Sequence, residues 1–329
     1  MPRIVDIHNH YYPKEYLDVL ERVIRNEKSV WAEAARSMKD NQLASHAGMT
    51  DIQKHIDDMD EAGVETEVIS LSVPMSYFAV EKDAVESAKV FNDALAEICA
   101  KYPKRFKAFA SLPLPHTDAS LKELDRAINT LGLHGVGLGA NAQHAHAHLD
   151  DPRIMPIYPE INRMKLTIFL HPAYPPGIEE QLDYGLWVAA GFLWDSTLAT
   201  LKLANAGVFA NNPEMNFIVP HLGNFLLAGI DRVAGPARYP SPGVQPAKME
   251  KPVKDYILGL YYDSIINNPA FWDLAVATVG LGHIVYGTDY PFVDGVAGVK
   301  RNIDRISALK ISDAEKDAIF GGTADRLLR

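Results

Sequence analysis

Residues 4–10 of the chain read IVDIHNH, a short β-branched run that leads directly into two histidines. Seven more short apolar runs follow at intervals, and longer stretches with helical spacing separate them. Strands that alternate with helices for most of a chain predict parallel βα units. The eight predicted strands comprise residues 4–7, 66–70, 106–111, 135–138, 166–170, 216–219, 259–262 and 283–286.

The number of these units favours a closed (β/α)8 fold of the α/β class, a TIM barrel. An open doubly wound sheet would show the same alternation, but polar residues follow most of the predicted strands, as in a barrel with its active site at the C-terminal face. Three long segments, 27–48, 173–194 and 235–252, are expected to be inserted loops after strands 1, 5 and 6, serving as lids or as surface decoration. No linker divides the sequence, so we expect a single domain over residues 1–329.

The composition is that of a globular protein with an acidic net charge. Of the 329 residues, 47% are hydrophobic and 22% are charged, which argues against intrinsic disorder. The formal net charge of −10 disfavours general electrostatic binding to nucleic acid or to an anionic membrane. The single cysteine, Cys99, has no intramolecular disulfide partner, and neither a signal peptide nor a membrane span is visible. We therefore expect a cytoplasmic protein.

Histidines and one aspartate mark the ends of four predicted strands. His8 and His10 are two residues apart in an extended chain, so their side chains point to the same side. His171, His221 and Asp289 each follow another apolar strand. A barrel brings these strand ends together at one face, where neutral imidazoles and a carboxylate suit a divalent ion such as Zn²⁺. A His-x-His motif alone is weak evidence, and it is the shared position of all five residues that predicts a metal site.

Four motifs occur in a characteristic order: His8-x-His10, then HP at 171–172, HLG at 221–223 and GTDYP at 287–291. This order resembles the amidohydrolase superfamily. The similarity is greatest to a branch of metal-dependent decarboxylases related to 2-amino-3-carboxymuconate 6-semialdehyde decarboxylase and to the hydroxybenzoate decarboxylases. Residues 59–64, 192–197 and 260–263 also resemble that branch.

The resemblance implies roles for the five strand-end residues. His8, His10, His171 and Asp289 would ligate one catalytic metal ion. His221 and Asp289 would transfer protons, together with metal-bound water. Many relatives hold a second metal through a lysine after strand 4, but residues 135–139 contain none, so a single ion is expected. Zn²⁺ is favoured with Mn²⁺ as the alternative, and no organic cofactor is expected.

Three further residues are candidates for contacts with a small-molecule carboxylic acid. By resemblance, Arg232 would hold a substrate carboxylate in a neighbouring subunit's site, which predicts a homodimer or a higher homo-oligomer. The alternative for Arg232 is a solvent-exposed position on a helix. Trp194 and Phe292 are expected near the mouth of the barrel, where they would either stack on a flat substrate or pack within a lid.

The resemblance implies a non-oxidative decarboxylase acting on a small aromatic or unsaturated hydroxy or amino acid. The alternative is a metal-dependent hydrolase of a lactone, ester or amide, which would use the same residues. The two activities differ in their products, because only decarboxylation releases CO2. A non-catalytic ligand-binding barrel is disfavoured by the complete set of five residues.

Overall fold

Eight parallel strands form the centre of the computed structural model, which describes residues 2–43, 46–142, 145, 147–235, 243–265 and 268–328. Three strands pair in the order β1-β2-β3 and five in the order β10-β9-β8-β7-β4. Single bridges, Ala110 with Val136 and Asn9 with Tyr290, join the two groups on both sides. The strands thus close into the expected TIM barrel. Their bounds are β1 Val5–His10, β2 Thr66–Ser70, β3 Phe106–Ala108, β4 Val136–Gly139, β7 Thr167–His171, β8 Asn216–Val219, β9 Tyr261–Asp263 and β10 Ile284–Val285.

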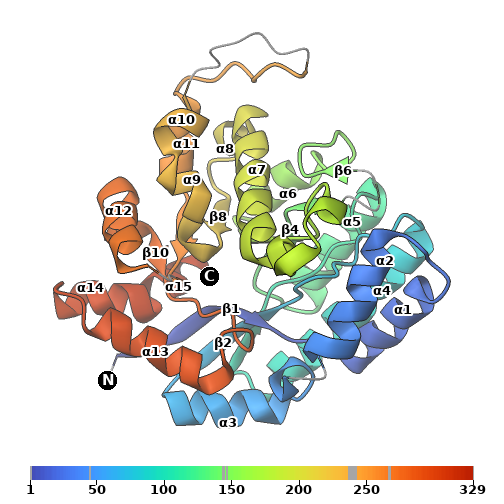
Figure 1. Cartoon of the computed structure of the whole chain (residues 1–329), viewed down its shortest axis with the longest axis horizontal. Coiled ribbons are helices and arrows are strands. Elements are labelled where there is room, and N and C mark those ends of the chain that lie inside the picture. The colour runs from blue at the N-terminus through green and yellow to red at the C-terminus, as the bar shows by residue number, and fades with distance from the viewer. Residues whose placement is uncertain are drawn as a thin grey trace.

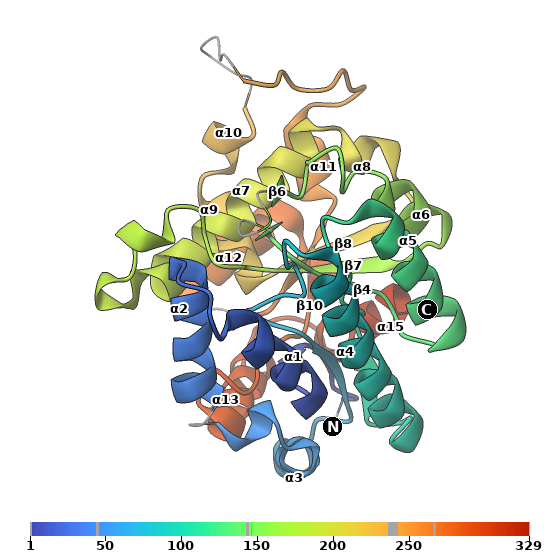
Figure 2. The same cartoon turned by 90° about the vertical axis from the view of Figure 1, so that its right-hand side faces the viewer.

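Helices surround the strands on the outside of the barrel (Figures 1 and 2). They are α1 Lys14–Ile24, α2 Val30–Ser37, α3 Ile52–Ala62, α4 Glu81–Lys101, α5 Thr117–Asp125, α6 Ile157–Arg163, α7 Phe192–Asn205, α8 Val208–Asn211, α9 Asn224–Ala228, α10 Ile230–Val233, α11 Val253–Leu258, α12 Pro269–Val279, α13 Gly295–Ser307, α14 Asp313–Asp317 and α15 Thr323–Leu327. A small antiparallel hairpin, β5 Asn141–Ala142 with β6 Ala147–His148, follows β4 and was not expected from the sequence.

Local sequence sets the ends of several helices. The Asp51 side chain accepts hydrogen bonds from the backbone amides of Gln53 and Lys54, which caps the start of α3. Gly63 ends the same helix with φ 78°, a conformation that glycine adopts without steric cost. These two residues determine where α3 begins and ends.

The barrel interior is filled by side chains and is not a pore. Residues from six strands or strand extensions form one inner cluster, in which the rings of Phe109 and Phe169 stack at 5.7 Å. Three residues near the C-terminus, Ala324, Leu327 and Leu328, complete it. A larger apolar cluster lies between the strands and the surrounding helices. Because side chains fill the interior, a polar site can form only at the face of the barrel where the strands have their C-terminal ends.

The three long segments differ in structure. The described part of residues 27–48 contains α2, a π-helical turn at Met38–Leu43 and the start of a short 3-10 turn, Ala47–Met49. Residues 173–194 contain short 3-10 and π-helical turns that lead into α7. In the segment 235–252, residues 236–242 lie outside the described part of the chain, and the described remainder forms neither helix nor strand.

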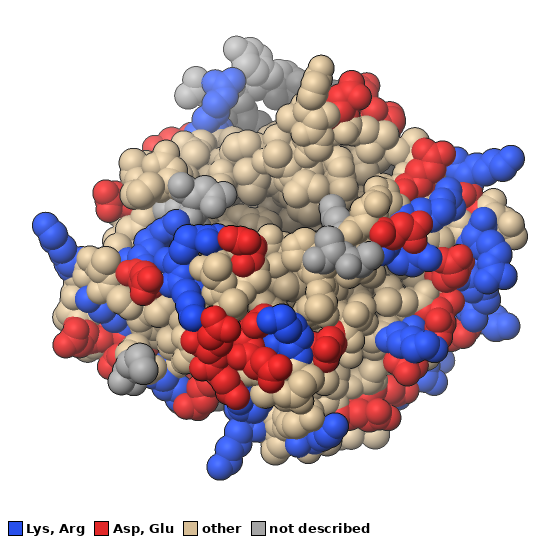
Figure 3. Space-filling model, turned by 60° about the horizontal axis from the view of Figure 1, so that its bottom comes forward, with Lys and Arg blue, Asp and Glu red and all other residues tan. Residues whose placement is uncertain are grey.

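Charged side chains of both signs are interspersed over one face of the molecule, and the hollow on this face is lined by uncharged residues (Figure 3). Among the helices that the structure describes, none is long and apolar enough to cross a membrane.

Candidate metal centre

Four of the residues that the sequence predicts as metal ligands meet at the C-terminal end of the barrel. His8 and His10 lie at the end of β1, His171 is the last residue of β7, and Asp289 lies beyond β10. One ligand atom from each residue lies within 4.8 Å of those of the other three. All three histidines are buried. The fold thus gathers three imidazoles and a carboxylate from three strands that are far apart in the sequence.

The free atoms of this cluster fit a bound cation. Nε2 of His8 lies 3.3 Å from Oδ1 of Asp289, and Nε2 of His10 lies 3.1 Å from the same oxygen. All three atoms are buried and have no hydrogen-bond partner. Buried polar atoms are normally paired, so a group of unpaired ligand atoms that face one another indicates a metal site. Nδ1 of His171 lies 2.8 Å from the carbonyl oxygen of Pro172, so Nε2 is the atom that could ligate, although the Ser72 hydroxyl lies 3.4 Å from it.

The protonation states of the cluster follow from burial and from the neighbouring carboxylates. Burial lowers the pKa of His10 to about 4 and that of His171 well below its usual value, so both are neutral and able to ligate at neutral pH. Burial also favours neutral His8, but Asp289 and Asp263 outweigh it and raise the pKa of His8 to about 9. A bound cation would replace the proton on Nε2 of His8 as the positive charge next to Asp289.

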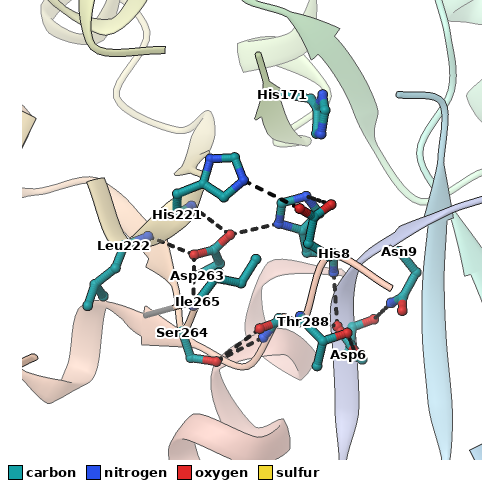
Figure 4. Close-up of polar contacts among 12 residues, drawn as sticks. Asp6, His8, Asn9, His171, His221, Leu222, Asp263, Ser264, Ile265 and Thr288 are labelled. Carbon is teal, nitrogen blue, oxygen red and sulfur yellow. Dashed lines mark hydrogen bonds and ion pairs between the residues drawn. The ribbon is translucent and has the colours of Figure 1, made fainter. Parts of the chain in front are cut away.

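Asp263, the last residue of β9, connects His8 and His221, two of the candidate histidines (Figure 4). Its Oδ2 accepts a hydrogen bond from Nδ1 of His8 at 2.7 Å and from the backbone amide of His221 at 2.9 Å. Its Oδ1 accepts from the amides of Leu222 at 2.8 Å and Ile265 at 3.1 Å. A carboxylate that accepts from Nδ1 of a histidine places the free lone pair on Nε2, toward the metal position.

The backbone is strained at two functional positions. His221 has φ 55° and Asp289 has φ 66°, values that residues other than glycine rarely adopt. Such strain persists where surrounding contacts hold it. Asp263 holds the amide of His221, and the amide of Asp289 donates to the carbonyl of His8 at 2.8 Å. These contacts aim the side chains of His221 and Asp289 at the same space.

A second buried carboxylate, Asp6, supports the loop that carries Asp289. It accepts hydrogen bonds from the Thr288 hydroxyl at 2.6 Å, from the Thr288 amide at 3.0 Å and from the His8 amide at 3.2 Å. Burial raises the pKa of Asp6 to about 8. The sequence analysis assigned no role to Asp6 or Asp263. Asp6 could have been noticed as a charged residue within an apolar strand. Asp263 could have been noticed because it ends a strand, as the candidate ligands do.

His221 lies beside the four-residue cluster and outside it. Its Nε2 is 3.6 Å from Oδ2 of Asp289, the oxygen that does not face His8 and His10. Its ring centre is 5.5 Å from that of His8, and its Nδ1 is buried without a hydrogen-bond partner. This position, next to the candidate metal cluster and slightly open to solvent, suits a group that transfers protons.

The three residues predicted to contact substrate lie in different places relative to the metal cluster. The Phe292 ring lies 5.8 Å from the ring of His10, at the edge of the metal centre. Trp194 is 48% exposed in the first turn of α7, whereas Phe192, two residues earlier, contacts the ring of His171 at 6.3 Å. Residues two apart on a helix point in nearly opposite directions, which separates these two side chains. Arg232 is exposed in α10, at the upper edge of the molecule in Figures 1 and 2.

Known proteins similar to this chain include several decarboxylases. Gamma-resorcylate decarboxylase of Rhizobium sp. (strain MTP-10005) is 29% identical, over 82% of this chain and 85% of that protein. The 2-amino-3-carboxymuconate-6-semialdehyde decarboxylase of Dictyostelium discoideum is 27% identical, over 97% of this chain and 90% of its own length. A solved structure of dihydroxybenzoic acid decarboxylase from Polaromonas sp. JS666, with bound manganese and the inhibitor 2-nitroresorcinol, is 25% identical with a TM-score of 0.78. The match covers 100% of this chain and 97% of the Polaromonas chain.

The family assignment rests on nearly the full length of the chain. The amidohydrolase family model matches residues 5–329, a range that includes β1 with its two histidines and the loop that carries Asp289. The order of the ligands along the barrel agrees with the resemblance seen in the sequence motifs. The protein belongs to the amidohydrolase family.

Proposed function

We propose that this protein is a metal-dependent decarboxylase that removes CO2, without oxidation, from a small aromatic or unsaturated hydroxy or amino carboxylic acid. The observation that carries the proposal is the cluster of His8, His10, His171 and Asp289 with His221 at its side. Relatives that align with 82% and 97% of this chain are decarboxylases of such acids. We propose that one barrel domain over residues 1–329 carries the whole activity.

The ligand set fits one divalent cation. When bound, the ion would hold a substrate carboxylate together with a neighbouring oxygen and withdraw charge from the acid. Three imidazoles and one carboxylate favour Zn²⁺, while the Polaromonas structure holds manganese, so Mn²⁺ is the competing ion. Reconstitution of metal-stripped protein with each ion in parallel, followed by measurement of turnover, distinguishes the two.

His221 and Asp289 are placed to move the proton that decarboxylation requires. The bond from the ring or alkene carbon to the carboxyl carbon breaks, CO2 leaves, and a proton takes its place on that carbon. Nε2 of His221 and Oδ2 of Asp289 are 3.6 Å apart, and both are close enough to the cluster to reach one substrate atom. The hydrogen bonds that hold the strained backbone at both residues keep these two groups in that position.

The remaining substrate contacts belong to the proposal as well. Phe292 lies where a flat ring beside His10 would stack on it. Arg232 is exposed, so it contributes to a substrate site only where a second copy of the chain brings its own site close. Exposed apolar side chains before and within α7, among them Leu182, Tyr184 and Trp194, offer a surface for such a homodimer.

A panel of acids and esters tests the proposal. Metal-loaded protein is incubated with ortho-hydroxybenzoic acids, unsaturated amino acids and lactones, and both CO2 release and consumption of water are measured. Release of CO2 with no new carboxylate supports the decarboxylase. A new carboxylate without CO2 identifies a hydrolase that uses the same metal and His221.

A further inference from the structure

Hydrogen bonds hold the residues on both sides of Asp289. The Thr288 hydroxyl donates to Asp6, and the same hydroxyl oxygen accepts from the backbone amide of Tyr290 at 3.2 Å (Figure 4). The carbonyl oxygen of Tyr290 accepts from the backbone amide of His10 at 2.9 Å. The residue after Asp289 is therefore bonded both to the residue before it and to the strand that carries two of the candidate ligands.

The side chain of Tyr290 connects this loop to helix α3 on the outside of the barrel. Its hydroxyl donates a hydrogen bond to Oδ2 of Asp58 at 2.7 Å. Its ring lies edge to face against the imidazole of His55, with a centre distance of 4.8 Å. His55 and Asp58 are three residues apart and so lie on the same face of α3. All three side chains are buried, so water does not compete for these contacts.

The face of α3 that meets Tyr290 is itself fixed. Nδ1 of His55 lies 2.5 Å from Oε2 of Glu67, a buried residue of β2. Oδ1 of Asp58 accepts a hydrogen bond from Nζ of Lys54, one turn earlier on the helix. The helix also packs against α13, which follows the Asp289 loop (Figures 1 and 2). Asp58 therefore presents its carboxylate to Tyr290 from a defined position.

The inserted segment after β1 packs closely on the same hydroxyl. A Cβ at Gly48 would lie 2.5 Å from the hydroxyl oxygen of Tyr290 and 3.0 Å from the ring carbon that bears it. Only glycine lets the backbone approach a buried side chain this closely. The close contact leaves the Tyr290 ring little room to move away from Asp58.

The strained backbone of Asp289 makes these contacts important for a bound cation. Asp289 has φ 66°, and a residue with a side chain keeps such a conformation only where its surroundings hold it. Without the contact to α3, the metal-free protein can relax to an unstrained backbone. Binding of a cation then requires that the strained conformation be restored, and the cost of restoring it lowers the metal affinity.

We propose that Tyr290 and Asp58 are positioning residues of the metal centre, because their hydrogen bond holds Asp289 in its ligating conformation before a cation binds. Neither side chain belongs to the cluster of candidate ligands. The inference rests on the metal centre of the proposed function and is independent of the reaction that this centre performs. It makes α3, a helix that contributes no ligand to that cluster, a part of the metal site.

Metal affinity and stability, measured separately on the full chain, test the inference. Tyr290→Phe keeps the ring and removes only the hydroxyl. The affinity for Zn²⁺ and Mn²⁺, measured by competition with a chelator, should fall by about three- to tenfold, the effect of one hydrogen bond. Tyr158→Phe is the matched control, since the buried Tyr158 hydroxyl donates to the Leu149 carbonyl at 2.9 Å from α6, which carries no candidate ligand. Both variants should lower the melting temperature of the metal-free protein, but Tyr158→Phe should keep native metal affinity.

Changes at Asp58 and Gly48 test the same hydrogen bond from its other sides. Asp58→Asn keeps an oxygen that accepts from the Tyr290 hydroxyl and should retain most of the metal affinity, whereas Asp58→Ala should lose as much as Tyr290→Phe. The double variant Tyr290→Phe/Asp58→Ala should bind no more weakly than either single variant, because both remove one contact. Gly48→Ala displaces the Tyr290 hydroxyl without deleting a hydrogen-bonding group, and it should also weaken metal binding.

The outcomes distinguish this inference from the proposed function. Native metal affinity in folded Tyr290→Phe and Asp58→Ala proteins, or an equal loss in Tyr158→Phe, would overturn the positioning role and leave the decarboxylase proposal in place. A native protein that binds neither ion would overturn both. The expected pattern of affinities in a protein that releases no CO2 from any acid supports the positioning role and refutes the decarboxylase assignment.

Discussion

The replacement Asp263→Asn tests how the fold prepares His8 for a metal ion. In the native protein both oxygens of Asp263 accept hydrogen bonds, two on each side. An asparagine has one carbonyl oxygen and one NH2 group. If the oxygen stays with the amides of Leu222 and Ile265, the NH2 group faces two other donors, Nδ1–H of His8 and the amide of His221.

This conflict changes the tautomer of His8. When the proton of the imidazole moves from Nδ1 to Nε2, Nδ1 can accept a hydrogen bond from the NH2 group of the introduced asparagine. A protonated Nε2, however, no longer binds the ion. Loss of the carboxylate partner of a metal-bound histidine typically costs 10- to 100-fold in metal affinity, or about 1.4 to 2.8 kcal/mol. The unpaired amide of His221 adds a loss of about 1 to 3 kcal/mol in unfolding free energy.

The assay is metal binding at fixed pH, by competition with a chelator of known affinity, together with thermal unfolding of the metal-free protein. Asp273→Asn is the matched control, since Asp273 is exposed on α12, away from β9. We expect the control to retain native affinity. Native metal affinity in a folded Asp263→Asn protein would refute the role of Asp263 in setting the tautomer.

Three other changes test separate parts of the structure. His221→Ala should keep the metal and lower kcat by about 10²- to 10⁴-fold, and unchanged turnover would contradict its acid–base role. Burial raises the pKa of Asp195 to about 7. The folded state therefore holds that proton more tightly than the unfolded one, and unfolding free energy should fall between about pH 4 and pH 7; denaturant titrations should show a flatter pH profile for Asp195→Asn. Gly223→Ala should cost about 1 to 3 kcal/mol in unfolding free energy, because Gly223 has φ 65° and a Cβ would lie 2.6 Å from the Tyr262 ring. Gly282→Ala, where the Cβ meets nothing within 4 Å, is the control and should leave thermal unfolding nearly unchanged.

The strands of the barrel could be predicted because each is a short, largely apolar run between helical stretches. All eight predicted ranges coincide with or overlap observed strands. The buried residues of α1, Tyr16, Val19, Leu20 and Ile24, recur at helical spacing, a signal from which this helix could be predicted. The two-residue strands β5 and β6 carry no comparable signal, because so short a pairing depends on tertiary contacts more than on local sequence.

The convergence of His8, His10, His171, His221 and Asp289 could be predicted because barrel topology brings strand ends together, whereas the choice of four of them as metal ligands came from the family resemblance. The supporting carboxylates could not, because their roles depend on which atoms they contact. Asp263 is informative only once its oxygens are seen against His8 and the strained backbone of His221. Likewise, the choice between Phe192 and Trp194 as the ring beside His171 depends on the exact start and rotation of α7.

The inner core of the barrel joins the two ends of the chain. Val5 and Ile7 pack in the same cluster as Leu327 and Leu328, and Arg3 forms an ion pair with Asp325 at 2.6 Å. During synthesis, β1 emerges before the other strands of the barrel, and the packing of its inward side chains stays incomplete until residues more than 300 positions later have been translated. The strand that carries His8 and His10 therefore acquires its final surroundings only at the last stage of folding, and loss of the last few residues would destabilise β1.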